Sequence, residues 1–333
     1  MLRVPARPRP RTGSRAILCC YHPDYFVALP ATHPFPMAKY PLLFEKLRAD
    51  GLLAAAAVRA PEEVLIDDLA LVHTQGYLER LAGDALSPAE QRRLGVPWSP
   101  RLWRRSRLAV QGTLLAARAA LTDGIAANLA GGTHHAFADH GEGFCVLNDV
   151  AVAIRVLQRE RLIERALVID LDVHQGNGTA AIFAGDAAVF TFSMHGERNY
   201  PTQKMQSSLD VGLADGTDDD AYLAALRASL DLVAARASAD IVFYLAGVDT
   251  VQGDRYGRLA LSEQGLRERE RCVLDWVCNA LGRPLVITIA GGYAATAERT
   301  ASLHAIVFAE AARLVATAGD RYADRPGVRS LQR

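Results

Sequence analysis

Three polar residues, Asp170, Asp172 and His174, end an apolar stretch of the chain. We expect the strand that precedes them to run to Asp172, so that its alternation would place all three side chains on one face. Carboxylate and imidazole groups are common zinc ligands. An isolated Asp-x-His pair is more often a helix cap beside a packed histidine, so this pattern alone does not establish a metal site.

A further carboxylate, Asp249, follows the apolar run Ile241 to Val248. Alone it would be a turn residue. Together with Asp172 and His174 it completes a set of three zinc ligands, and this set leaves one coordination position open for water and a substrate carbonyl. The sequence therefore predicts one catalytic Zn²⁺ held by Asp172, His174 and Asp249.

Two other groups have side chains suited to proton transfer and carbonyl activation. His134 and His135 lie side by side after Gly131 and Gly132. Such a pair is either a solvated turn or, near a metal, a pair of proton carriers at neutral pH. Tyr293 follows two glycines, and it is either a buried tyrosine on a tight turn or a phenol that donates to a developing oxyanion.

These residues follow short apolar runs that alternate with longer helical patterns, which is typical of a parallel sheet flanked by helices. In such a sheet, ligands bind at the carboxyl ends of the strands. The expected strands are Ala16 to Tyr21, Ile125 to Ala130, Ala166 to Asp172, Ala188 to His195, Ile241 to Val248 and Leu285 to Ala290. The expected helices are Ser106 to Leu121, Asp149 to Arg159, Asp219 to Ala237, Ser262 to Leu281 and Ala295 to Ala318.

The composition restricts the possible partners. Lys plus Arg and Asp plus Glu number 37 each, so no net charge draws the chain to nucleic acid or to an acidic membrane. The sequence contains no apolar run of about 18 residues, so it predicts no membrane-spanning helix. Five cysteines, an odd number without zinc-finger spacing, are typical of reduced thiols, and we expect a soluble, cytoplasmic protein.

We expect a single domain over residues 16–320, because no repeat or low-complexity block interrupts the pattern. Residues 1–15 are rich in arginine and proline and contain no apolar core of a secretory signal, so they are predicted to form a flexible leader. Residues 321–333 are predicted to form a C-terminal tail.

From residue 21 to residue 318 the chain resembles the histone deacetylases and their acetylpolyamine and bacterial relatives, which share the arginase-deacetylase fold. The motifs that carry this resemblance, in the family's order, are GGTHHAFADHGEGFCVLNDVAVAI, VIDLDVHQGNGT, FTFSMH, LAGVDTVQGDRYGRL and AGGY. Within the family the chain looks closest to the class IV type, through HPFPMAKY at 33–40, PWS at 97–99 and the HQGNG turn. The resemblance implies an α/β fold, a three-layer αβα sandwich with a central, mostly parallel eight-stranded sheet.

The resemblance also implies zinc-dependent hydrolysis of acyl-lysine amides, with His134 and His135 as the acid and base pair. Tyr293 would polarise the carbonyl, and Asp170 would orient His134. Asn177 replaces the aspartate that most of the family places beside the second histidine, so we expect His135 to stay neutral to lower pH. A structural potassium ion would be bound by Asp170, Asp172, His174, Ser193 and Met194.

The tunnel for the acyl-lysine is the least constrained part of the predicted site. The resemblance places Gly143 and Phe144 along it, with Cys145 beside them. Tyr256 stands where many relatives carry leucine or methionine, and it either packs on the surface or holds the lysine stem. Tyr200 could line the same entrance.

Three other functions share the fold or part of the predicted site. A binuclear manganese ureohydrolase shares the fold but needs further carboxylates, and Gly176 and Gly247 stand where those would be. A non-catalytic module that binds acyl-lysine would keep the tunnel without needing every catalytic group. Acetylpolyamine deacetylation is the alternative within the enzyme class, so the expected partner is an acyl-lysine peptide or protein or a small acylated amine. The acyl chain length and the oligomeric state stay open.

Overall fold

The computed structural model describes residues 17–323, and side chains as far as residue 317. The predicted leader therefore lies outside the described residues, as do residues 324–333 of the predicted tail. Residues 321–323 of that tail instead form the last residues of a long helix, α10. Within the described residues, no helix is both long and apolar enough to cross a membrane.

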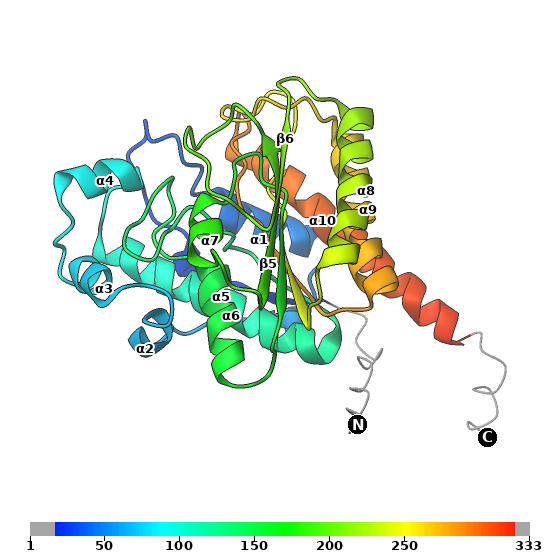
Figure 1. Cartoon of the computed structure of the whole chain (residues 1–333), viewed down its shortest axis with the longest axis horizontal. Coiled ribbons are helices and arrows are strands. Elements are labelled where there is room, and N and C mark those ends of the chain that lie inside the picture. The colour runs from blue at the N-terminus through cyan, green and yellow to red at the C-terminus, as the bar shows by residue number, and fades with distance from the viewer. Residues whose placement is uncertain (1–16, 324–333) are drawn as a thin grey trace.

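A single eight-stranded sheet forms the middle layer of the protein (Figure 1). Its strand order is β2-β1-β3-β8-β7-β4-β5-β6. Every pairing between neighbouring strands is parallel, so the sheet is wholly rather than mostly parallel. The strands are β1 (Leu18–Cys20), β2 (Val58–Arg59), β3 (Ile125–Asn128), β4 (Ala166–Asp170), β5 (Val189–Gly196), β6 (Leu209–Leu213), β7 (Ile241–Leu245) and β8 (Leu285–Thr288).

Helices cover both faces of the sheet, as the fold class predicted. In Figure 1, α5 and α6 lie on one side of the sheet and α8, α9 and α10 on the other. The first of these layers also contacts α3, and α1 packs against α10 in the second. The helices are α1 (Lys39–Ala49), α2 (Ile66–Leu69), α3 (Gln75–Ala82), α4 (Pro88–Leu94), α5 (Pro100–Asp123), α6 (Asp149–Arg159), α7 (Asn177–Ile182), α8 (Asp219–Arg236), α9 (Glu263–Asp275), which continues as a π-helical turn Trp276–Leu281, and α10 (Ala297–Ala323).

The central strands are buried on both faces, which explains their continuous apolar runs. β4 and β7 have no exposed residue along their length. Several strands nevertheless end earlier than predicted: β4 stops at Asp170 and β7 at Leu245. The apolar residues beyond these ends are buried in the loops that build the site, and hydropathy does not distinguish such a loop from a buried strand.

Two strands and several helices were not predicted. β2 and β6 are the two edge strands, and their short or mixed patterns resemble loops. α5 begins at Pro100 rather than Ser106, because the Ser99 side chain accepts a hydrogen bond from Leu102 N and proline occupies the first helical position. The unpredicted helices are α1, α2, α3, α4 and α7.

One buried arginine joins the tips of β4 and β7. Arg269, on α9, has no exposed surface, and its Nη1 donates to Leu171 O at 3.2 Å and to Thr250 Oγ1 at 3.1 Å. Its Nη2 donates to Glu270 Oε1 at 2.5 Å, and Glu270 Oε2 accepts from Tyr244 Oη at 2.6 Å. Because Leu171 and Thr250 each lie beside a predicted zinc ligand, Arg269 holds both ligand loops in place.

Replacing Arg269 with methionine should destabilise the protein strongly. The change leaves the buried Glu270 carboxylate without its charged partner, so we expect the free energy of unfolding to fall by about 3–5 kcal/mol in urea titrations. Arg271→Met on the same helix is the control: its partner Glu310 keeps Arg267 and Arg313, and the loss should stay below about 1 kcal/mol. Equal losses in the two variants would contradict this assignment.

Candidate active site

Four neighbouring strands deliver the predicted site residues to one edge of the sheet. β3, β8, β7 and β4 are consecutive in the sheet, and their carboxyl ends point the same way because all are parallel. The histidine pair follows β3, Tyr293 follows β8, Asp249 follows β7 and Asp172 follows β4. This is the edge at which open parallel sheets bind ligands.

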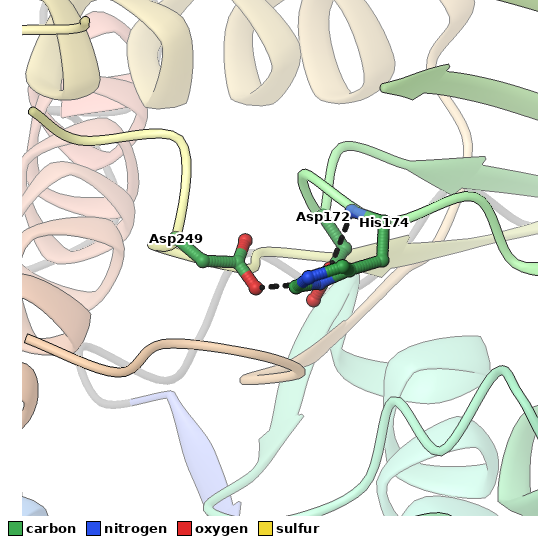
Figure 2. Close-up of side chains that lie close together, drawn as sticks. All are labelled: Asp172, His174 and Asp249. Atoms are coloured by element: carbon green, nitrogen blue, oxygen red, sulfur yellow. Dashed lines mark hydrogen bonds and ion pairs between the residues drawn. The ribbon is translucent and has the colours of Figure 1, made fainter. Parts of the chain in front are cut away.

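The three predicted metal ligands converge there (Figure 2). One ligand atom each from Asp172, His174 and Asp249 can be chosen so that all lie within 4.8 Å of one another, and all three residues are buried. His174 Nδ1 lies 2.9 Å from Asp172 Oδ1 and 3.2 Å from Asp249 Oδ2. A nitrogen and two carboxylates at this spacing form a compact donor set of the kind that binds zinc.

The predicted continuation of the strand to Asp172 is wrong. Strand alternation does not place Asp170, Asp172 and His174 on one face, because β4 ends at Asp170 and the other two lie in the following loop. Hydrogen bonds shape that loop instead. Asp172 N donates to Asp170 Oδ1 at 3.2 Å, His174 N donates to Asp172 Oδ1 at 2.9 Å, and Val173 N donates to Asp249 Oδ1 at 2.8 Å.

The donor set fits a cation. Asp249 Oδ2 is a buried carboxylate oxygen that accepts no hydrogen bond among the described residues, and its contact with His174 Nδ1 at 3.2 Å is an ion pair. Gly291 N donates to Asp172 Oδ2 at 2.7 Å, and a Cβ at Gly291 would lie 2.1 Å from Asp249 Oδ2. Glycine is therefore required at this position to let the backbone approach both carboxylates. A buried carboxylate oxygen without a hydrogen-bond donor is costly unless a positive charge lies beside it.

The charges of the three groups point to the same conclusion. Burial raises the pKa of Asp249, and the charge of Asp172 raises it further, to about 7. Burial lowers the pKa of His174, but its close contacts with the two aspartates and their charges outweigh this and raise it to about 10. The aspartates thus retain a proton on the imidazole between them. A divalent cation would replace that proton, because metal binding requires the neutral imidazole.

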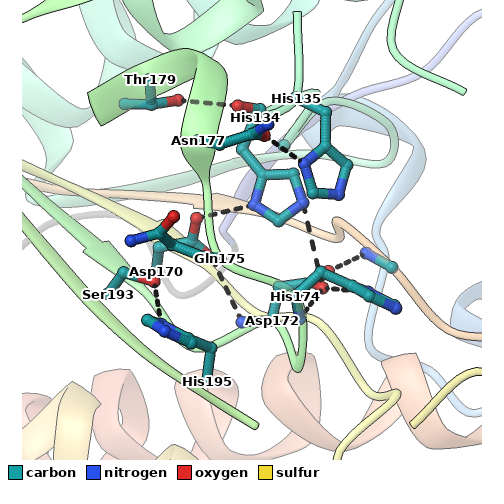
Figure 3. A network of polar contacts seen from close by, with 12 residues as sticks. His134, His135, Asp170, Asp172, His174, Gln175, Asn177, Thr179, Ser193 and His195 are labelled. Carbon is teal, nitrogen blue, oxygen red and sulfur yellow. Dashed lines mark hydrogen bonds and ion pairs between the residues drawn. The ribbon is translucent and has the colours of Figure 1, made fainter. Parts of the chain in front are cut away.

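The two histidines lie beside this group and have different partners (Figure 3). Their ring centroids are 4.1 Å apart. His134 Nδ1 lies 2.7 Å from Asp170 Oδ2, and although burial lowers its pKa, the charges of Asp170 and Asp172 raise it to about 9. His135 Nδ1 lies 2.7 Å from Asn177 Oδ1. Burial, followed by the charges of His134 and His174, holds the pKa of His135 well below its ordinary value.

Glu142, which was not predicted, sets the orientation of the Asn177 amide. Asn177 Nδ2 donates to Glu142 Oε1 at 2.8 Å, so Asn177 Oδ1 must face His135. An amide oxygen only accepts, and therefore His135 carries its proton on Nδ1 and presents Nε2 as a free base. Tyr200 Oη also donates to Glu142 Oε1, at 2.6 Å. The sequence signal was an acid directly before Gly143 and Phe144, the two residues that the resemblance places along the tunnel.

Two other unpredicted residues hold Tyr293 in place. Asp254 Oδ2 accepts from Tyr293 N at 2.6 Å, and Asp254 Oδ1 accepts from Tyr256 N at 2.9 Å. Lys39 is fully buried; its Nζ donates to Ala290 O at 2.8 Å and lies 5.8 Å from the centroid of the Tyr293 ring. Burial, with the charges of Asp172 and Asp249, holds the pKa of Tyr293 well above 10, so the phenol keeps its proton and can donate it. The sequence signal for this role was Lys39 itself, a charged residue among the mostly apolar residues 33–40.

The predicted tunnel residues surround one cavity of about 370 Å³. Gly143, Phe144, Tyr200 and Tyr256 line it, together with His135, His174 and Tyr293. Gly143 has a φ of 52°, and a Cβ there would lie 2.6 Å from His135 Cδ2, so this wall requires glycine. Cys145 lines a second, smaller cavity behind the ligands.

The proposed potassium ligands also lie near one another in part. Asp170 and Ser193 are direct neighbours in the β4–β5 register, and Met194 follows Ser193 on β5. Ser193 Oγ lies 2.9 Å from His195 Nδ1. Asp170 Oδ1 is hydrogen-bonded to the main chain of Asp172, so the ligand loop and this region share one carboxylate.

Comparison with known proteins identifies the family. The model of the histone deacetylase domain matches residues 33–309. The chain belongs to the histone deacetylase family. Histone deacetylase 2 of Arabidopsis thaliana is 31% identical over 283 residues, which cover 82% of this chain and 73% of that protein. An uncharacterized protein of Picosynechococcus sp. is 49% identical over 274 residues, covering 82% of this chain and 91% of that protein.

Other histone deacetylase relatives agree. The histone deacetylase-like amidohydrolase of Pseudomonas aeruginosa is 30% identical, over 74% of this chain and 69% of that protein. The crystal structure of an HDA15 HD domain matches the fold with a TM-score of 0.73 at 21% identity, covering 90% of this chain and 88% of that one. Membership of the histone deacetylase family supports deacetylase activity, the hydrolysis of an acetyl-amide bond.

The Asn177→Asp variant should shift the pH profile of this activity. A carboxylate beside Nδ1 would stabilise the His135 cation and raise the pKa of His135. As the pH falls, His135 would then become protonated at a higher pH than in the original protein, so the acidic limb of kcat/KM should move up by roughly one pH unit. Glu142→Gln/Asn177→Asp is the matched variant, because glutamine can donate to the new carboxylate. An acidic limb that stays in place in both variants would contradict the base role of His135.

Proposed function

We propose that this chain is a zinc-dependent hydrolase that removes acyl groups from lysine side chains. The observation that carries the proposal is the convergence of Asp172, His174 and Asp249 beside a histidine pair and a protonated phenol. In this proposal those three residues hold the Zn²⁺. When bound, zinc supplies a Lewis acid for the carbonyl and lowers the pKa of its water towards ~7.

The protein groups have complementary tasks in the proposed reaction. His135, neutral and with Nε2 free, accepts the proton of the attacking water. Tyr293 donates a hydrogen bond to the carbonyl oxygen as negative charge develops there. His134, held protonated by Asp170, donates a proton to the departing lysine nitrogen. The products are a free lysine amine and a carboxylate.

We also propose that K⁺ binds beneath this site, through oxygen atoms of five residues of β4, its following loop and β5. The shared Asp170 carboxylate and the Asp170–Ser193 register support this placement. Oxygen donors suit a hard monovalent cation, and its charge would offset the buried carboxylates. The five residues are Asp170, Asp172, His174, Ser193 and Met194.

Metal removal and one conservative variant test the proposal. Chelation should abolish hydrolysis of an acetyl-lysine peptide, and added Zn²⁺ should restore it. Asp249→Ala should lose bound zinc as measured by metal analysis.

Tyr293→Phe should keep the zinc and the fold but lower kcat by about 10²- to 10³-fold, because one oxyanion donor is lost. Peptide binding without turnover by the zinc-loaded protein would instead favour the non-catalytic binding module.

The cavity behind the ligands favours a short acyl group. It measures about 30 Å³, and its lining includes Phe35, Tyr40, Arg105 and Cys145. Such a space holds little more than one or two waters, so a long chain would force packed side chains apart. The sequence left the acyl chain length open, and this cavity supports acetyl.

We therefore expect kcat/KM to fall from acetyl- to butyryl- to myristoyl-lysine in one peptide sequence. The decrease between acetyl and myristoyl should be about tenfold or more, which corresponds to an overpacking cost of about 1–3 kcal/mol. Equal or higher kcat/KM for myristoyl-lysine would show that the cavity opens to admit the chain.

A further inference from the structure

The mouth of the large cavity is lined by four arginines and by no acidic residue. These arginines are Arg92, Arg93, Arg198 and Arg258, and we call them the mouth arginines. Over the whole chain, basic and acidic residues balance at 37 each, so the mouth departs locally from a neutral average. A concave surface with aromatic walls strengthens such a field, because fewer water molecules screen it.

Few carboxylates offset this charge. Among the described residues, the one ion pair of the mouth arginines joins Arg258 Nη1 to Asp215 Oδ2 at 3.3 Å. Glu142, next to Gly143 of the tunnel wall, contacts His140, Asn177 and Tyr200 and forms no ion pair with a mouth arginine among the described residues. Asp254 is partly buried and accepts main-chain hydrogen bonds from Tyr256, Gly257 and Tyr293. The positive charge at the mouth is therefore available to a ligand.

The mouth arginines come from three separate segments. Arg92 and Arg93 lie in the last turn of α4, Arg198 in the loop between β5 and β6, and Arg258 in the loop between β7 and α9. All four have exposed side chains. Surface arginines are ordinarily solvated individually, but these share the rim of one opening that leads to the catalytic groups. Charges spread around an opening suit an extended partner that carries several anionic groups.

We propose that the substrate is an acyl-lysine within an acidic polypeptide segment, whose aspartate or glutamate side chains pair with the mouth arginines. This inference rests on the proposed function. Guanidinium groups bind carboxylates with matched geometry, and such pairs at a rim act mainly on the rate of encounter and on specificity. A segment rich in lysine and arginine, or a polyamine with its remaining ammonium groups, meets like charge at the same rim.

Matched peptides test this inference directly. One acetyl-lysine peptide is prepared with glutamate, alanine or arginine on both sides of the acetyl-lysine, and kcat/KM is measured with the zinc-loaded enzyme at fixed KCl. At low ionic strength we expect the glutamate peptide to exceed the arginine peptide by about tenfold or more. Added NaCl should reduce this ratio towards one, because salt screens exposed charges.

Variants of the mouth arginines locate the effect. Arg92→Gln/Arg93→Gln/Arg198→Gln should reduce the ratio to about twofold while leaving kcat for the alanine peptide near the original value. The corresponding lysine variant should restore much of the ratio, since charge rather than shape gives most of the discrimination. Arg227→Gln, an exposed change on α8 away from the mouth, is the control and should leave the ratio unchanged.

The alanine peptide separates the two proposals. If the alanine peptide is hydrolysed and kcat/KM is equal for the glutamate and arginine peptides, the acidic-segment inference is overturned. The proposed function stays intact in that case. If none of the peptides is hydrolysed, the proposed function fails. Fluorescence anisotropy with the same labelled peptides then decides the inference alone: tighter binding of the glutamate peptide that depends on the mouth arginines supports it, and equal binding overturns it.

Discussion

Two buried carboxylates, those of Asp172 and Asp249, face one another across the tips of adjacent strands, and their mutual repulsion constrains everything around them. Main-chain N–H groups of Val173 and Gly291 satisfy one oxygen of each. Arg269 joins the loops after β4 and β7 through hydrogen bonds to Leu171 O and Thr250 Oγ1 rather than to either carboxylate. What remains is a concentrated negative charge, which suits the divalent cation that we propose. The parallel sheet provides this arrangement by bringing β4 and β7 side by side.

Much of this could be predicted from the sequence, for identifiable reasons. Strands buried on both faces are apolar throughout, so β4, β7 and β8 were visible as short runs, and polar residues after them marked the ligand edge. The helix Asp149–Arg159 was predicted at both ends because Asn148 is a strong cap and the apolar period is regular. The catalytic assignments depended on the family resemblance, since a histidine pair or a lone tyrosine has several structural explanations.

The rest depended on interactions that sequence patterns do not encode. The loop after β4 is shaped by hydrogen bonds between residues that include the predicted metal ligands, so the predicted continuation of the strand was wrong. Glu142, Lys39 and Asp254 act through partners far away in the chain, and Lys39 contacts a carbonyl 251 positions later. The volume behind the ligands and the charge around the mouth depend on how separate loops meet in space.

The tunnel wall and the α4 segment are joined through their main chains. Gly143 N donates to Arg93 O at 3.3 Å, and Phe144 N donates to Leu94 O at 2.8 Å. Phe144 also keeps a φ of 68°, a strained conformation for a residue with a side chain. These two hydrogen bonds to the end of α4 therefore help to hold the strained backbone of Phe144 in place. Any shift of this helix end would therefore also move the Phe144 ring, which lines the cavity.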